Sequence, residues 1–235
     1  MKKKQWAVLI GGILAALGLT GYILLDRTTG NNVEIESVLP AQTQGAEAQT
    51  ADAAPAASAV APDELNGEWN IAEGSKVYWS VTTSRETVNF VNEGVQGSWT
   101  VNVSDSAAMK GEGRVDMSRL DSGNAQRDEH VKQADFFDVA AYPEATFTAT
   151  SFSALPAEWT EGTSVPVEMK GTMTVRGVEK EVVFQTEAAY SGGQLMLSGT
   201  TTVTFSDFGL TNPHSIVLET ENELEVRLEL VLAKQ

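Results

Sequence analysis

The two histidines are the residues of this chain best suited to acid–base or metal chemistry. His130 has Asp128 and Glu129 close by, whereas His214 follows an Asn-Pro pair. An imidazole beside carboxylates can bind a metal ion or act as a general base. A polar role for His130 on a short helix is the simpler interpretation, and His214 is expected in a loop. A hydrolase that uses His130 with an acidic neighbour stays open as an alternative.

Motifs for nucleophilic or phosphate chemistry are missing from the sequence. There is no Gly-x-Ser-x-Gly elbow, and the Gly-Glu-Gly at 111–113 lacks the Lys of a phosphate-binding loop. The chain has no cysteine, which excludes disulfides, thiolate metal sites and a cysteine nucleophile. We therefore expect a protein that is not an enzyme, with no catalytic residues, no metal and no cofactor.

The charge balance limits the partners of the chain. It has 16 Lys and Arg against 32 Asp and Glu, and the part after residue 27 carries 12 against 31, a net charge of −19. Nucleic acids and anionic lipid surfaces both attract Lys and Arg and repel so acidic a body. Nucleic acid is therefore not expected as a partner.

The first 27 residues have the pattern of a membrane segment. Three lysines precede an uncharged apolar stretch from Trp6 to Leu25, and twenty helical residues span about 30 Å, the thickness of the bilayer core. No small-x-small cleavage site follows. We expect a single-pass anchor in the cell inner membrane, with the lysines cytoplasmic and the rest in the periplasm. Cleavage as a signal, with secretion to the periplasm, is the alternative. The spacings Gly11-to-Ala15 and Gly12-to-Ala16 fit helix pairing, so a homodimer stays open.

A linker and one domain are expected after the anchor. Residues 28–64 are rich in Ala, Gln, Thr and Pro and lack periodic apolar positions, as in a flexible linker. Residues 65–235 alternate apolar and polar positions, as in Val77, Trp79 and Val81. The last such run places Leu224 to Leu232 on one face, with Glu225, Arg227 and Glu229 on the other.

This alternation is typical of antiparallel sheets with one buried face. About eight strands are expected, with hairpin turns at 92–94 and 191–193, and one helix around 127–138. The pattern allows a closed barrel or a sandwich. Six aromatic residues lie in the strand-like segments: Trp79, Phe90, Trp99, Phe147, Phe184 and Phe205. They could fill a packed core, or they could line a barrel wide enough for a ligand.

Three motifs relate the chain to a known family. A charged segment ending at His130 is followed by Asp-Phe-Phe-Asp at 135–138, Tyr-Pro at 142–143 and Thr-Phe at 146–147. Gly-Thr-Met-Thr-Val-Arg-Gly-Val follows at 171–178, and Ser-Asp-Phe-Gly at 206–209. In this order they resemble the YceI-like family of polyisoprenoid-binding proteins, and the resemblance covers most of residues 67–235.

The resemblance implies an all-β fold: a lipocalin-like, eight-stranded antiparallel barrel with a short helix. Its apolar interior would accommodate an isoprenoid chain, and no catalytic residues are carried over. The residues expected to bind the ligand are Trp79, Phe90, Trp99, Phe136, Phe137, Phe147, Met173, Val175, Phe205 and Phe208.

The predicted function is non-catalytic binding or carrying of an isoprenoid-type lipid, a polyprenyl chain or a quinone, at the outer side of the cytoplasmic membrane. The alternative is a membrane-anchored β-domain with a filled core that acts as an adaptor for another envelope protein. An open interior would support lipid binding, whereas a filled interior would support the adaptor.

Overall fold

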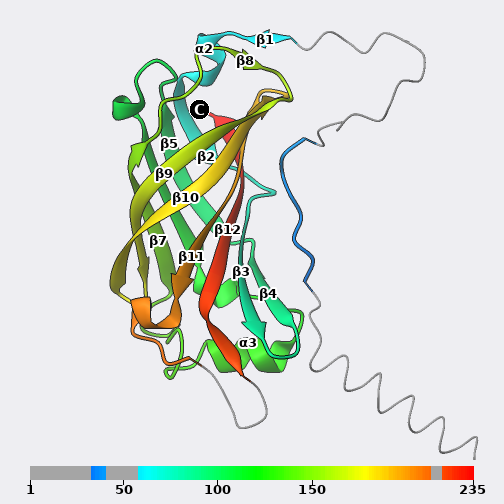
Figure 1. Cartoon of the computed structure of the whole chain (residues 1–235), viewed down its shortest axis with the longest axis vertical. Coiled ribbons are helices and arrows are strands. Elements are labelled where there is room, and N and C mark those ends of the chain that lie inside the picture. The colour runs from blue at the N-terminus through cyan, green and yellow to red at the C-terminus, as the bar shows by residue number, and fades with distance from the viewer. Residues whose placement is uncertain (1–32, 41–57, 213–218) are drawn as a thin grey trace, which may run out of the picture.

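A computed structural model describes residues 33–40, 58–212 and 219–235 of the 235-residue chain. No helix among these residues is long and apolar enough to cross a membrane. The expected anchor over residues 1–27 lies outside the described residues, and so does His214. Figure 1 shows an elongated barrel with the short helix α3 at one end and β1, β8 and helix α2 at the other.

The described residues are mostly β-structure. The strands are β1 (Ala59–Val60), β2 (Gly67–Ile71), β3 (Lys76–Thr83), β4 (Thr87–Asn92), β5 (Val95–Val101), β6 (Lys110–Asp116), β7 (Glu144–Phe152), β8 (Trp159–Thr160), β9 (Ser164–Val175), β10 (Val178–Ser191), β11 (Gln194–Thr204) and β12 (Thr220–Lys234). The helices are α2 (Pro62–Leu65) and α3 (Ala125–Val131), with the 3₁₀ turns η1 (Ser106–Ala108), η2 (Met117–Arg119) and η3 (Phe205–Phe208).

The sheet closes into an eight-stranded antiparallel barrel, as the sequence predicts. Neighbouring strands run in the order β2, β5, β6, β7, β9, β10, β11 and β12, and β12 returns to β2. Because every strand of a closed barrel pairs on both sides, this arrangement leaves no free sheet edge there.

The strands β3 and β4 lengthen the wall at one end. β12 pairs with β2 near its C-terminus and with β3 over the rest of its length, and β4 pairs with β3 as β5 pairs with β2. The segment 92–94, expected to be a hairpin turn, instead separates β4 from β5. The Asn92 amide donates to the Asp116 carbonyl and its oxygen accepts from the Gly94 N–H, so the bend is fixed by side-chain hydrogen bonds. The predicted turn at 191–193 is confirmed between β10 and β11.

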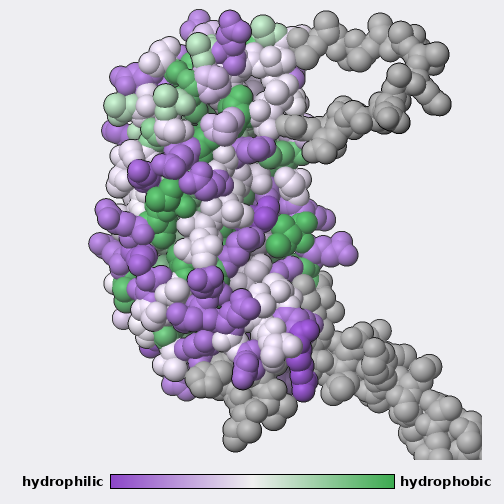
Figure 2. Space-filling view, in the orientation of Figure 1, coloured by the Kyte–Doolittle hydropathy of each residue, from purple (hydrophilic) through white to green (hydrophobic). Residues whose placement is uncertain are grey.

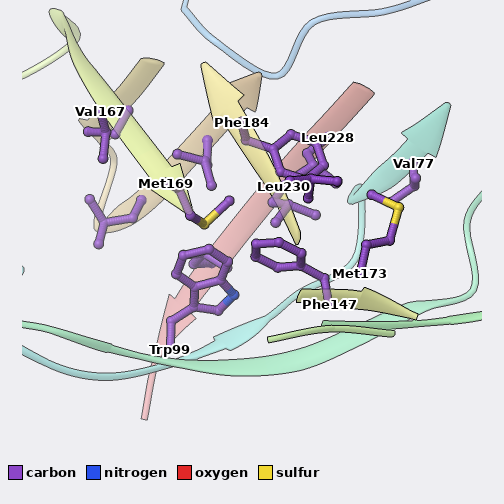
Figure 3. Packing of buried hydrophobic residues seen from close by; sticks show 14 of the residues in the cluster. Val77, Trp99, Phe147, Val167, Met169, Met173, Phe184, Leu228 and Leu230 are labelled. Carbon is purple, nitrogen blue, oxygen red and sulfur yellow. The ribbon is translucent and has the colours of Figure 1, made fainter. Parts of the chain in front are cut away.

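One end of the barrel is filled by side chains. Trp69, Phe184 and Met169 are almost fully buried there, and the Trp69 indole N–H donates to the Leu65 carbonyl at the end of α2. Figure 3 shows Trp99, Phe147 and Phe184 directed toward one another inside the wall, beside Leu228 and Leu230. We call this the closed end; the other end, beside α3, is the open end.

Helix α3 covers a gap in the wall at the open end. Strand β4 does not pair with β6, which ends at Asp116. Beyond that point the backbone of β4 is joined to the following segment by the isolated bridge between Val91 and Asp121. The helix begins after Asn124, whose side chain accepts from the N–H groups of Gln126 and Arg127. It ends at Val131, well before the predicted limit of 138, because residues 132–141 form successive turns and Asp138 has a φ of 47°.

Residues 33–40 lie against the outside of the barrel, and we call them the outer strap (Figure 1). The Val38 N–H donates to Oε2 of Glu229 over 2.9 Å. Glu229, predicted to face solvent, is therefore fully buried although it points outward. The outer strap, β1 and most of α2 fall within the range 28–64 that the sequence assigns to a linker, so ordered contacts begin earlier than residue 65.

The rest of the visible outer surface is polar, with small apolar areas between hydrophilic residues (Figure 2). This distribution follows from the alternation along each strand, which directs every second side chain outward.

Candidate functional site

The interior of the barrel holds an apolar cavity of about 480 Å³, within the usual range for small-molecule sites. It extends from α3 and the β3–β4 turn to Trp99, Phe184 and Leu230, where the packed core begins. All ten residues that the sequence analysis names as ligand-binding line this cavity. That they contact a ligand stays a prediction.

Aromatic rings form one side of the cavity near the open end. Trp79 of β3 stacks on Phe90 of β4, with ring centroids 6.0 Å apart, and Phe137 meets Trp79 edge-on. A second edge-on pair, Phe147 with Phe184, closes the inner end at 5.3 Å. Such pairs hold aromatic side chains in defined positions. The wall is therefore preformed and offers flat apolar surfaces to a chain between them.

The polar lining residues gather at the open end. Arg85 and Glu86 come from the turn between β3 and β4, whereas Arg127 and His130 come from α3. Arg85 and His130 are also exposed to solvent. An elongated apolar cavity with charged groups at its exposed end suits an amphipathic ligand, because the polar part can stay near water.

Arg127 is fixed by a small buried network. Its Nε donates to the Ser122 hydroxyl over 2.8 Å, a second N–H donates to the Ser122 carbonyl, and the guanidinium lies 5.8 Å from the Phe90 ring centroid. Burial lowers the pKa of Arg127, while the carboxylates of Asp128 and Glu86 oppose this effect. An arginine remains charged at neutral pH despite such a shift, so the cavity has a permanent cation at its open end.

His130 lies at the exposed edge of the cavity and contacts Phe136. Its ring lies edge-on to Phe136 at 5.0 Å, and the side chain is exposed. The carboxylate of Asp128, its expected partner, instead accepts the hydroxyl and the backbone N–H of buried Ser122. Across the described ranges, no group of three or more His, Asp or Glu could hold a metal ion. The position of His130 is thus that of a residue at the edge of the cavity.

The Ser-Asp-Phe-Gly motif forms η3 and places two aromatics in the cavity. Thr204 begins the turn, and its hydroxyl and N–H exchange hydrogen bonds with Asp207. Asp207 also pairs with Lys180 of β10, and this hydrogen bond is the main reason why the pKa of Asp207 lies below its usual value. Phe205 and Phe208 are held inward as a result.

Several lining residues were not predicted. Val77, Val81, Leu224, Val226 and Leu228 occupy the inward positions of strands whose alternation the sequence does show, so the same rule could have found them. Arg85, Glu86 and Arg127 carry no such signal, because two segments far apart in the sequence, the β3–β4 turn and α3, bring them to the open end.

A closed antiparallel barrel with an apolar cavity defines the class of lipocalin-like β-barrel proteins. Residues 69–232 match the YceI-like domain, which covers well over half of the chain. The chain belongs to the YceI-like family, and the resemblance drawn from its motifs is confirmed.

Curated relatives share part of the sequence. A UPF0312 protein of Vibrio cholerae serotype O1 is 33% identical over 102 residues, which is 41% of this chain and 50% of the relative. A UPF0312 protein of Pseudomonas putida (strain GB-1) is 32% identical over 98 residues, 39% of this chain and 47% of the relative. The chain thus matches about half the length of these relatives.

Solved structures share the fold. BcnA of Burkholderia cenocepacia aligns with a TM-score of 0.57 at 19% identity, over 67% of this chain and 95% of BcnA. A polyisoprenoid binding domain from Saccharophagus degradans, implicated in plant cell wall breakdown, aligns with a TM-score of 0.58 at 13% identity. That alignment covers 71% of this chain and 98% of the domain. At these identities the likeness shows the fold alone.

Proposed function

We propose that this protein binds and carries an isoprenoid-type lipid, a polyprenyl chain or a quinone, in the barrel cavity and without catalysis. The observation that carries the proposal is the apolar cavity lined by aromatic and branched aliphatic side chains. Membership of the YceI-like family and the likeness to a polyisoprenoid binding domain support the same ligand class.

The energetics favour a protein that exchanges its lipid with the membrane over one that retains the lipid very tightly. Hiding the five carbons of an isoprene unit from water is worth about 4 kcal/mol, at about 0.8 kcal/mol per methylene-sized group. A lipid that comes from a bilayer gains none of this, because one apolar medium replaces another. Selectivity then depends on the shape of the cavity and on the polar groups at the open end, such as Arg127. The hydrophobic term therefore neither drives nor opposes exchange of the lipid with a membrane.

We also propose that residues 1–27 anchor the chain in the cytoplasmic membrane with the barrel on its outer side. The lysines before the apolar stretch support this orientation. A tethered barrel meets lipids at a raised local concentration, which suits the exchange described above. Protease digestion of intact spheroplasts should remove the barrel from the outer face if the anchor is uncleaved.

The cavity is the observation that favours binding over the filled-core adaptor. Side chains fill the closed end, but the half beside α3 has room for a ligand. An adaptor would not require this space, since its contacts would be made by the outer surface.

Mass spectrometry of organic extracts from the purified chain tests the proposal. Val226 points into the cavity and Val183 points outward from β10, so Val226→Phe and Val183→Phe add the same group inside and outside. We expect an isoprenoid lipid with the unaltered chain and with Val183→Phe, and at least a fivefold lower yield with Val226→Phe. The absence of isoprenoid from the unaltered chain, or equal yields from both variants, would refute the proposal.

A further inference from the structure

The outer strap occupies a built site on the outer wall. Tyr78 of β3 and Glu229 of β12 both point away from the cavity, yet their exposed fractions are 1% and 0%. The backbone N–H of Glu36 contacts the Tyr78 hydroxyl at 3.3 Å, and that of Val38 donates to Glu229. Outward residues of a barrel are normally wet, so the strap accounts for their burial.

The buried carboxylate of Glu229 accepts a backbone hydrogen bond from the strap. The Ser198 hydroxyl donates to its Oε1 over 2.7 Å, the Arg227 guanidinium lies 3.5 Å from the same oxygen, and the Val38 N–H donates to Oε2. A buried charge is costly unless its oxygens accept hydrogen bonds. The strap therefore supplies one of the donors that make this burial tolerable.

Further contacts fix the direction of the strap. The Asn89 amide of β4 donates to the Val33 carbonyl over 3.0 Å, and Lys76 forms an ion pair of 2.7 Å with Glu36. Lys76 begins β3, whereas Asn89 pairs with Ser80 further along it, toward the open end. Val33 thus lies nearer the open end of the barrel than Val38 does.

We propose that the outer strap orients the barrel on its tether, so that the open end of the cavity faces the membrane. This inference rests on the proposed function and on the proposed anchor. With the strap docked, only five residues (28–32) separate the anchor from Val33, a reach of at most about 18 Å. A fully flexible linker over 28–64 would span about 30–35 Å on average and would allow every orientation.

Fluorescence quenching in vesicles tests this orientation with the full chain. The chain has no cysteine, so single labels can be attached through Gln126→Cys on α3, at the open end, and Glu158→Cys before β8, at the closed end. The vesicles are neutral phosphatidylcholine with a nitroxide on the head group. We expect at least threefold stronger quenching at position 126 than at 158.

Strap variants show whether the strap causes this asymmetry. Val38→Pro removes the N–H that binds Glu229, and Lys76→Glu places a like charge beside Glu36; the two together should release the strap and make quenching equal at both positions. Ser37→Pro is the matched control, because the hydrogen bond of Ser37 is made to Leu39 within the strap. Hydrogen exchange of residues 33–40 reports release directly.

Three outcomes would overturn the proposal. Quenching could be equal at positions 126 and 158 in the unaltered chain, it could stay unequal after the strap is released, or the chain could fail to float with the vesicles. Lipid extracts of the same samples keep this test separate from the proposed function. Asymmetric quenching without bound isoprenoid would refute the proposed lipid ligand but support the orienting role of the strap. Bound isoprenoid with equal quenching would support the lipid ligand but refute the orienting role of the strap.

Discussion

The ring of Phe137 packs edge-on against the indole of Trp79, with ring centroids 5.9 Å apart and an interplanar angle of 68°. Trp79 belongs to the wall strand β3, and Phe137 belongs to the turns that follow α3. This contact connects two elements: the segment that covers the gap in the wall, and the strand β3 that lines the cavity. Both aromatic residues also line the cavity, so one contact supports the wall and shapes the site.

Phe137→Asp should release bound lipid. A carboxylate at this position would place a charge against the apolar lining, which disfavours an isoprenoid chain. We expect at least a fivefold drop in the lipid recovered per protein by mass spectrometry. His130→Ala is the comparison variant, because its side chain lies at the exposed edge of the cavity, and it should change the yield less than twofold. Equal lipid yields from unaltered protein and Phe137→Asp would contradict the assignment of this wall.

Asp128→Ala should destabilise the open end. The change leaves the hydroxyl and N–H of Ser122 without their acceptor in a buried site, and removes a carboxylate close to Arg127. Loss of such a buried acceptor costs about 2–3 kcal/mol of unfolding free energy, measurable by urea denaturation. Glu129→Ala, at an exposed neighbour, should cost less than about 0.5 kcal/mol. Equal losses for both variants would show that the Ser122 network contributes little.

Gly171→Ala should destabilise the barrel through crowding. A Cβ there would lie 2.3 Å from Cζ of Phe147 and 2.5 Å from the Thr148 carbonyl oxygen. Overpacking of this kind costs about 1–3 kcal/mol. Gly113→Ala is the control, because its Cβ would meet no atom closer than 4.0 Å. A thermal melt should separate the two variants, and an unchanged midpoint for Gly171→Ala would contradict the close packing of β7 on β9.

The pair of Asp207 with Lys180 should make stability depend on pH in the acid range. Lys180 and the Thr204 N–H lower the pKa of Asp207 in the folded protein, so its stabilisation is complete above the unfolded pKa of about 3.8. The stabilisation is lost as the pH falls through the lower, folded value.

Asp207→Asn should therefore cost about 1 kcal/mol at pH 7, as for the loss of a capping interaction with Thr204, and progressively less below about pH 4. Urea unfolding at pH 7, 5 and 3 measures the gap between the two proteins. Glu179→Gln, at an exposed position of β10, should show no such convergence. A gap that stays constant down to pH 3 would mean that the ion pair does not stabilise η3.

The strands and the cavity wall could be predicted because their signals are local. Alternation along β3 and β12 shows which side chains point inward, and the motifs at 135–138 and 206–209 mark segments that reach the cavity. The choice of a barrel over a sandwich needed the family resemblance, because apolar and polar residues alternate in the same way along the strands of both folds.

Other features depend on contacts between distant segments and have no local signal. Glu229 has the polar position of an outward residue, and only its hydrogen bond with Val38, 191 residues earlier, shows that it is covered. The helix α3 ends early although Lys132 to Asp135 are mostly polar, as on the exposed face of a helix, because the turns that follow bring Phe137 to Trp79. Long-range packing decides both cases.

The gap between β4 and the rest of the wall gives the barrel a seam that is held mainly by side chains. Along this seam one backbone bridge, Val91 with Asp121, replaces the continuous ladder found between other strands, and α3 covers the remainder. Passage of a branched lipid chain through a complete ladder would break a row of backbone hydrogen bonds. Here the cover is joined to the wall by the single Val91–Asp121 bridge and by aromatic contacts such as Phe137 with Trp79, so this side of the cavity depends on far fewer backbone hydrogen bonds than the rest of the barrel.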